Sequence, residues 1–314
     1  NLSLNSQNRL AIPEAGGIDP LVLLLQNGSA GAKEQAATGL ANLAANSAAN
    51  KMAINEAGGI EPLVQVLRDG GTAAQERAAG ALANLSLSAA NQKVIATAGG
   101  VEPLVKALRE GSTAAKEQAA AALGNLSLDG QNQMAIAQID GIKPIVHLLC
   151  NGSSAAKERA ARVLGNLAAN TEVVVAITEA GGIEPLIHVL QDGSTAAKER
   201  AAGALRNLSI NTTNQVAIAE AGGIRLLVQL LCDGSTTARE RAAATLGNLC
   251  LNAQNRRTIA EAGGIEPLLQ LRCEGSTAAK ERATAALKNL SVDPANHAAI
   301  TKLQRKKEAP KPFV

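Results

Sequence analysis

One arrangement of apolar and polar residues recurs along almost the whole chain. Its clearest marker is a Leu-x-Asn-Leu element, whose asparagines are separated once by 42 residues and then five times by 41. A pair of glycines keeps the same period, with Asp140-Gly141 as its one variant. Such self-similarity predicts stacked copies of one structural unit instead of a single globular core. The marker asparagines are Asn42, Asn84, Asn125, Asn166, Asn207, Asn248 and Asn289.

Each unit is predicted to contain three helices, which makes the fold class all-α. A short first helix starts at a capping side chain and ends at the glycine pair, because glycine adopts the left-handed conformation of a helix C-cap without strain. The second helix has proline in its first turn, followed by a run such as Leu63-Val64-Gln65-Val66-Leu67. A Gly-Ser-Thr turn leads into the third helix, which ends at the marker. The predicted caps of the first helices are Asn5, Ser88, Asp129, Asn170, Asn211, Asn252 and Asp293.

The repeats predict a single array over residues 1–303, followed by a basic, disordered tail over 304–314. Partial repeats occupy 1–7 and 294–303. Because no polar capping repeat precedes the array, we expect the chain to be a fragment, and Pro13 should interrupt the first short helix. The full repeats are about 8–48, 49–89, 90–130, 131–171, 172–212, 213–253 and 254–293.

The composition fits such a stack and excludes several functions. The apolar residues are almost all aliphatic, with Phe313 as the one aromatic residue, so helices carrying many small side chains can pack closely. A formal net charge of +3 does not favour nucleic acid or a membrane surface as partner. The apolar runs are far shorter than the ~20 residues needed to span a bilayer, so we expect no membrane insertion.

The four cysteines predict a reducing compartment. Cys150, Cys232 and Cys273 occupy the same position in three repeats, and Cys250 replaces a residue that is usually serine. Equivalent positions in stacked repeats lie about one helix-packing distance apart, beyond the ~7 Å limit for a disulfide. We therefore expect buried, reduced thiols and a cytoplasmic or nuclear protein.

The order of the elements resembles the armadillo family. The match covers roughly residues 1–303, and the segments Lys116-Glu117-Gln118-Ala119-Ala120 and Leu123-Gly124-Asn125-Leu126-Ser127-Leu128 are most similar to the armadillo region of plant U-box ligases and related plant or algal arrays. No U-box is present in this chain. The resemblance implies a right-handed superhelical solenoid, whose third helices line a concave groove where the asparagine binds the backbone of an extended peptide.

Helical geometry places a second polar row beside the asparagines. At 100° per residue, leucines such as Leu123 and Leu126 point to the core, whereas the asparagine and the residue seven positions before it point the same way, two turns apart. Arginine fills that earlier position in five of seven repeats. Arg162, Arg206 and Lys288 add charge near this face. The earlier position holds Gln35, Arg77, Gln118, Arg159, Arg200, Arg241 and Arg282.

These two rows predict a peptide-binding groove. An asparagine amide can donate to and accept from a peptide backbone, and an extended chain advances ~3.3 Å per residue, so seven repeats could hold on the order of 14 residues. The arginines would favour carboxylates or phosphates. Two alternatives stay open: glutamates next to the arginines could neutralise them, and the asparagines could cap neighbouring backbone. The predicted site residues are the seven marker asparagines with Arg77, Arg159, Arg162, Arg200, Arg206, Arg241 and Arg282.

The leading hypothesis is a monomeric scaffold or adaptor, not an enzyme, that binds an extended acidic or phosphorylated protein segment. The alternative is the substrate-binding region of a U-box ubiquitin ligase. A nuclear-import receptor is disfavoured, because that branch of the family carries tryptophan four residues before the asparagine, where this chain has small residues or Arg162.

The sequence shows no arrangement of residues that is typical of catalysis, metal binding or nucleic-acid binding. His147, His188 and His297 cannot converge, so we expect no catalytic residue, no metal site and no cofactor. Without aromatic platforms we expect no nucleic-acid partner. The basic run Arg305-Lys306-Lys307 weakly resembles an import signal, with a solvated terminus as the alternative.

Overall fold

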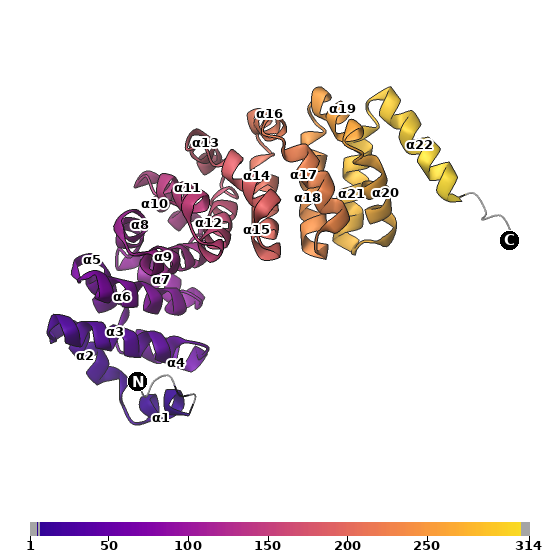
Figure 1. Cartoon of the computed structure of the whole chain (residues 1–314). Coiled ribbons are helices and arrows are strands. Elements are labelled where there is room, and N and C mark those ends of the chain that lie inside the picture. Colours follow the sequence, from indigo (N-terminus) through magenta and orange to yellow (C-terminus); the bar gives the residue numbers. More distant parts are fainter. Residues whose placement is uncertain (1–4, 6, 309–314) are drawn as a thin grey trace. The chain divides into compact units, whose positions relative to one another are not determined.

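The computed structural model describes residue 5 and residues 7–308, and these form 22 α-helices and no strand (Figure 1). The predicted all-α solenoid of three-helix repeats is therefore confirmed. The chain divides into two compact units, residues 1–173 and 174–314, each with its own stack of repeats.

The three helices of the repeat recur in strict order along the chain. The first helices are α1 (Asn8–Glu14), α4 (Ala48–Glu56), α7 (Ala89–Thr97), α10 (Gly130–Gln138), α13 (Thr171–Glu179), α16 (Thr212–Glu220), α19 (Ala253–Glu261) and α22 (Pro294–Glu308). The second helices are α2 (Ile18–Asn27), α5 (Ile60–Asp69), α8 (Val101–Glu110), α11 (Ile142–Asn151), α14 (Ile183–Asp192), α17 (Gly223–Asp233) and α20 (Ile265–Glu274). The third helices are α3 (Ala30–Ala44), α6 (Thr72–Leu85), α9 (Thr113–Leu126), α12 (Ser154–Leu167), α15 (Thr195–Leu208), α18 (Thr236–Leu249) and α21 (Thr277–Leu290).

The predicted start and stop signals act as expected at nearly every first helix. Six of the seven predicted caps accept backbone N–H groups of the opening turn, and Ser88 makes no such bond. The first glycine of each pair has a φ between 69° and 78°, and Asp140, the variant, has a φ of 57°. Each first helix from α1 to α19 is therefore followed by a left-handed residue, which turns the chain into the second helix.

Third helices of successive repeats pack against one another and form the centre of each unit. In residues 1–173, α3, α6, α9 and α12 make this stack, and in residues 174–314 it is made by α15, α18 and α21 (Figure 1). The leucines that flank each marker asparagine are fully buried in most repeats, as Leu123 and Leu126 are. Alanines such as Ala119 fill the remaining contacts, so neighbouring helices can approach closely.

A second row of asparagines, in the first helices, links neighbouring repeats. Each is at most 6% exposed, and four of them donate to a backbone carbonyl of the preceding repeat, for example Asn255 to Gln215 O at 3.0 Å. Buried amides need such partners, so the row fixes how the repeats stack. This row was not predicted above, although its 41-residue spacing is visible in the sequence, where Val173 interrupts it. Its members are Asn50, Asn91, Asn132, Asn214, Asn255 and Asn296.

Three local expectations were wrong. Cys150, Cys232 and Cys273 are exposed, because their position lies on the outer side of the second helices; Cys250 is buried, and all four are free thiols. Pro13 lies inside α1, in its last turn, and does not interrupt it. The tail is helical from residue 304 to Glu308, as the end of α22, whereas residues 309–314 lie outside the described residues, as does most of the partial repeat at 1–7.

No single helix within residues 7–308 is both long and apolar enough to cross a membrane. Two helix pairs, α13 with α14 and α16 with α17, reach the required length and composition only together, and each pair is bent by 82°.

Candidate functional site

The marker asparagines lie on the third helices and use their amide nitrogens inside the array. Nδ2 of Asn84 donates to Ala41 O, and Nδ2 of Asn166 to Gly124 O, each at 2.9 Å. Asn289 bonds Gly247 O in the same way at 2.9 Å. Each bond reaches the last turn of the preceding third helix, where carbonyls lack helical partners. The marker asparagines therefore cap neighbouring backbone through their amide N–H groups, which is one of the two alternatives left open by the sequence.

Serines two residues after the marker add to this contact. Ser127 Oγ lies 3.1 Å from Nδ2 of Asn166, and Ser209 Oγ lies 3.0 Å from Nδ2 of Asn248. Asn166 and Asn248 thus use both amide N–H groups within the array, whereas Asn84 and Asn289 each make one such bond. The row of seven marker asparagines, called the ladder below, can offer its side-chain oxygens to a ligand. Oxygens that accept no hydrogen bond from any described residue, and that are not buried, are the Oδ1 atoms of Asn84, Asn166, Asn248 and Asn289.

Two steps of the ladder are covered by arginine. Arg162 donates from Nη1 to Oδ1 of Asn125 at 2.8 Å and from Nη2 to Ala121 O at 2.9 Å, and Asn125 is buried. Arg206 donates from Nε and Nη2 to Oδ1 of Asn207, at 3.2 and 3.0 Å. Arg162 and Arg206, both predicted site residues, therefore do contact the marker asparagines. Each arginine occupies the asparagine oxygen that an N–H group of a ligand would otherwise reach.

The glutamates beside the arginine row neutralise it in part. Arg159 pairs with Glu117 of the preceding repeat at 3.4 Å, while Arg77 lies 3.7 Å from its own neighbour Glu76. Serines that cap the following third helix donate to three of these glutamates, as Ser153 does to Glu117 at 2.5 Å. The alternative that glutamates neutralise the arginines therefore holds in part within residues 1–173, where Arg159 is paired across repeats and Arg77 lies near a carboxylate of its own repeat.

The arginine row is least neutralised in residues 174–314. Arg200 and Arg282 are exposed, and neither forms an ion pair with a described residue. Arg241 is half-buried and donates to Glu199 O at 2.6 Å. Burial, followed by the positive charge of Arg200, lowers the pKa of Arg241 below its usual value; Arg206 adds to this effect, and the carboxylates of Glu199 and Glu240 oppose it. An incoming anion would relieve the repulsion between these neighbouring arginines.

A hollow of about 330 Å³ brings five predicted site residues together in residues 174–314. Its floor consists of small residues, Ala244, Gly247 and Ala285, so backbone can approach closely. Ile210 is the one large apolar side chain at its edge. The predicted residues that line it are Arg206, Asn207, Asn248, Arg282 and Asn289.

A similar hollow of about 210 Å³ lies on the third helices of residues 1–173. Asn42, Arg77 and Asn84 line it together with Glu76 and Gln118. The carboxylate makes this hollow less positive than its counterpart in the other unit.

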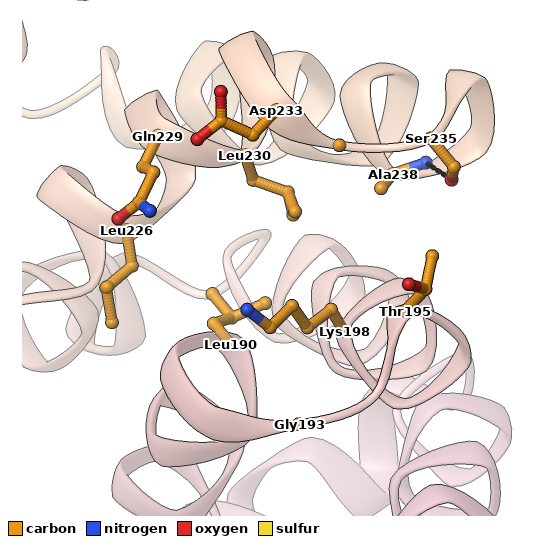
Figure 2. Close-up of a pocket in the computed structure, with 11 residues that line it drawn as sticks. Leu190, Gly193, Thr195, Lys198, Leu226, Gln229, Leu230, Asp233, Ser235 and Ala238 are labelled. Atoms are coloured by element: carbon orange, nitrogen blue, oxygen red, sulfur yellow. Dashed lines mark hydrogen bonds between the residues drawn. The ribbon is translucent and has the colours of Figure 1, made fainter.

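Another hollow recurs near the turns between second and third helices. Figure 2 shows it in residues 174–314, where Lys198 and Asp233 lie on opposite sides of a space of about 170 Å³. Lys33 and Asp69 line the equivalent space, of about 310 Å³, in residues 1–173. Each lies where the second-to-third-helix turns of adjacent repeats meet, and it holds none of the predicted site residues, so we interpret it as a gap in packing between repeats.

The described residues contain no group of three or more His, Cys, Asp or Glu side chains that could hold a metal ion. His147, His188 and His297 are all exposed and lie on different repeats.

Stacked three-helix units with a polar row along their third helices define the class of armadillo repeat proteins, which are scaffolds. Residues 6–309 match the sequence profile of the plant U-box protein ARM repeat region, and the chain belongs to that family. Comparison with curated protein sequences gave no match.

Several engineered proteins of known structure are similar. One crystallised engineered protein shares 34% identity with a TM-score of 0.83, over 91% of this chain and 71% of its own. A designed armadillo repeat protein shares 27% identity with a TM-score of 0.69, over 74% of this chain and 99% of its own. Another, in complex with the peptide (KR)4, shares 25% identity with a TM-score of 0.66, over 74% and 99%.

Proposed function

We propose that this chain is a scaffold that binds an extended, acidic or phosphorylated protein segment along its third helices, above all in residues 174–314. The observation that carries the proposal is the hollow in which Asn248 and Asn289 lie beside Arg282, an exposed arginine without an ion pair within the described chain. A side-chain acceptor next to a free guanidinium suits a chain that offers backbone N–H groups and carboxylates.

The binding chemistry follows from the partners that the side chains already have. Since Nδ2 of Asn248 is occupied by Arg206 O and Ser209 Oγ, its Oδ1 is the atom left to accept from a peptide N–H. Occupied donors also hold the amide in one orientation, which reduces the entropy lost on binding. Guanidinium groups of Arg200 and Arg282 would then form paired, charge-assisted hydrogen bonds with carboxylates or phosphates.

We expect this chain to prefer a peptide of the opposite charge to the one in complex with the designed protein, (KR)4. That peptide consists of lysine and arginine. In this chain, arginine stands seven residues before the marker asparagine in five repeats, and the chain has no tryptophan that could stack on basic side chains. Like-charge repulsion would therefore oppose a basic peptide.

A panel of fluorescein-labelled extended peptides tests this proposal by fluorescence anisotropy at two salt concentrations. We expect acidic and phosphoserine peptides to bind more tightly than a lysine-arginine peptide of equal length, and to weaken as salt rises, because the contacts are screened charges. Tighter binding of the basic peptide would overturn the proposal.

A second candidate function rests on the family match. The profile that covers residues 6–309 describes the repeat region of plant U-box proteins, so the array could be the substrate-binding part of a ubiquitin ligase whose U-box lies outside this chain. Affinity purification of the full-length protein would separate the two: recovery of ubiquitin-conjugating components supports the ligase, and their absence supports a plain adaptor.

A further inference from the structure

Large aliphatic residues follow five of the marker asparagines by three positions, and all of them are exposed. Between 62% and 67% of each residue is open to solvent. The other two repeats have Ala45 and Ala169 at this position. We call the five residues the aliphatic row; they are Leu87, Leu128, Ile210, Leu251 and Val292.

The aliphatic row is fixed beside the asparagine ladder by the backbone. In each case the N–H of the aliphatic residue donates to the carbonyl oxygen of the asparagine three residues earlier, for example Leu251 N to Asn248 O at 3.1 Å and Ile210 N to Asn207 O at 3.4 Å. Ile210 also lines the hollow that contains Asn248 and Arg282. The apolar row and the acceptor row thus belong to one surface.

A row of this kind is not explained by the packing of the chain. Single exposed aliphatic residues are common in soluble proteins, but apolar side chains that recur along one edge of a polar groove indicate an interaction surface. On the first helices, exposed apolar residues also recur in repeat register, as Leu10, Met52, Val175 and Val216, but none of them follows a marker asparagine by three positions. The ladder is therefore flanked by charge on one side and by apolar surface on the other.

We propose that the aliphatic row is the apolar half of the peptide site, and that its occupant is an extended protein segment in which aliphatic and acidic residues alternate. The inference rests on the proposed function and adds the pattern of the partner. In four of the seven repeats the order along the chain is arginine, asparagine, aliphatic residue, as in Arg241, Asn248 and Leu251. Successive side chains of an extended chain point to opposite sides, so a chain whose backbone follows the asparagines presents every second side chain to the arginines and the others to the aliphatic row.

Residues 174–314 contain the longest uninterrupted stretch of this pattern. Three consecutive repeats each supply an arginine, an asparagine and an aliphatic residue. One acidic and one aliphatic side chain per repeat corresponds to two peptide residues, which extend ~7 Å. A segment of about six residues would therefore fill the three repeats. The aliphatic members are Ile210, Leu251 and Val292.

The test compares two labelled peptides of twelve residues, one alternating glutamate with leucine and one alternating glutamate with serine, by anisotropy on the whole chain. The substituted chain carries Ile210→Ser, Leu251→Ser and Val292→Ser, which remove only exposed side chains. The matched control carries Val175→Ser and Val216→Ser, exposed aliphatic positions on first helices. Circular dichroism verifies that each variant is folded.

We expect the glutamate-leucine peptide to bind at least about tenfold more tightly than the glutamate-serine peptide, because burial of apolar side chains adds to the charge term. The triple substitution should abolish this advantage, so that the two peptides bind with affinities within about twofold of each other. The control pair should leave the advantage of the glutamate-leucine peptide unchanged. Equal affinity of both peptides for the unsubstituted chain, or an advantage that survives the triple substitution, overturns the inference while the proposed function stands. Absence of binding by both peptides overturns the two together.

Discussion

At the scale of single residues, the two asparagine rows have different tasks. The first-helix row is buried and holds repeats together, whereas the third-helix row is half-exposed and keeps its carbonyl oxygens open at Asn84, Asn166, Asn248 and Asn289. An amide that is fully enclosed cannot serve a ligand, but its loss leaves an unpaired carbonyl in the core. Substitutions in the first-helix row should therefore affect stability, and those in the third-helix row should also affect binding.

Asn255→Ala tests the buried row. Asn255 is 3% exposed and donates to Gln215 O at 3.0 Å, so the substitution leaves that carbonyl without its partner. We expect a loss of about 1–3 kcal/mol in the free energy of unfolding, measured by urea denaturation. Gln254→Ala, at an exposed position of the same helix, serves as control and should change it by less than about 0.5 kcal/mol. Equal effects of the two substitutions would contradict the role assigned to the row.

The thiol groups provide a second residue-scale prediction. Burial raises the pKa of the Cys250 thiol to about 12 from an ordinary value of 9.0. Cys150, Cys232 and Cys273 are exposed, so a thiol reagent at pH 8 should modify three cysteines quickly and Cys250 only on unfolding. Four equally fast reactions in the folded protein would show that Cys250 is accessible.

The same raised pKa predicts a pH dependence of stability. Below pH 9 the thiol is protonated in both the folded and the unfolded chain, so its contribution is constant. Between about 9 and 12 the unfolded chain loses the proton first, and the free energy of unfolding falls as pH rises. Chemical denaturation of Cys250→Ala alongside the unsubstituted chain isolates this effect, since the variant should lack that part of the decrease.

At the scale of elements, the glycine pair determines how each first helix joins the second. Gly222 has a φ of 78°, whereas Gly223 faces a different constraint: a Cβ there would lie 2.7 Å from Ile218 O. The first position is limited by backbone conformation and the second by contact with backbone that cannot move.

Gly222→Ala should cost about 1–2 kcal/mol, the usual penalty for a non-glycine residue in the left-handed region. Gly223→Ala should cost more, because the new methyl group overlaps the Ile218 carbonyl. Gly130→Ala is the control, since a Cβ at this helical position meets nothing within 4 Å and alanine is the better helix former. Urea denaturation should rank Gly223→Ala as least stable and Gly130→Ala as most stable; another order would contradict this account of the junction.

Elements were predictable from the sequence because their signals are local. Caps such as Asp129, glycines with positive φ and prolines in first turns act within a few residues, so the helix order was confirmed. The exposure of Cys150 was not predicted correctly, because it depends on which side of the second helix faces outward. The pairing of Nδ2 with the preceding repeat was likewise left open, since it depends on the distance between stacked helices.

At the scale of the whole molecule, the repeats share one structure, but single residue differences give each repeat a different binding surface. Seven similar third helices give a ladder, yet Arg162 and Arg206 cover two of its oxygens and Glu117 neutralises one of its arginines. The predicted site residues thus fall into two groups once their partners are known. Open acceptors occur in both parts of the chain, but they lie beside unpaired arginines in residues 174–314, which the sequence alone could not indicate.

Charge reversal is the sharpest test of whether this face binds an acidic extended chain. Arg200→Glu with Arg282→Glu replaces two exposed arginines, and Lys106→Glu with Lys280→Glu is a control of the same net charge change at exposed positions on other faces. The affinities of the glutamate-serine peptide and a lysine-serine peptide are measured for both variants by anisotropy. We expect the arginine variant, but not the control, to lose at least about tenfold in affinity for the acidic peptide and to bind the basic peptide more tightly. An unchanged preference for the acidic peptide in the arginine variant would contradict this expectation.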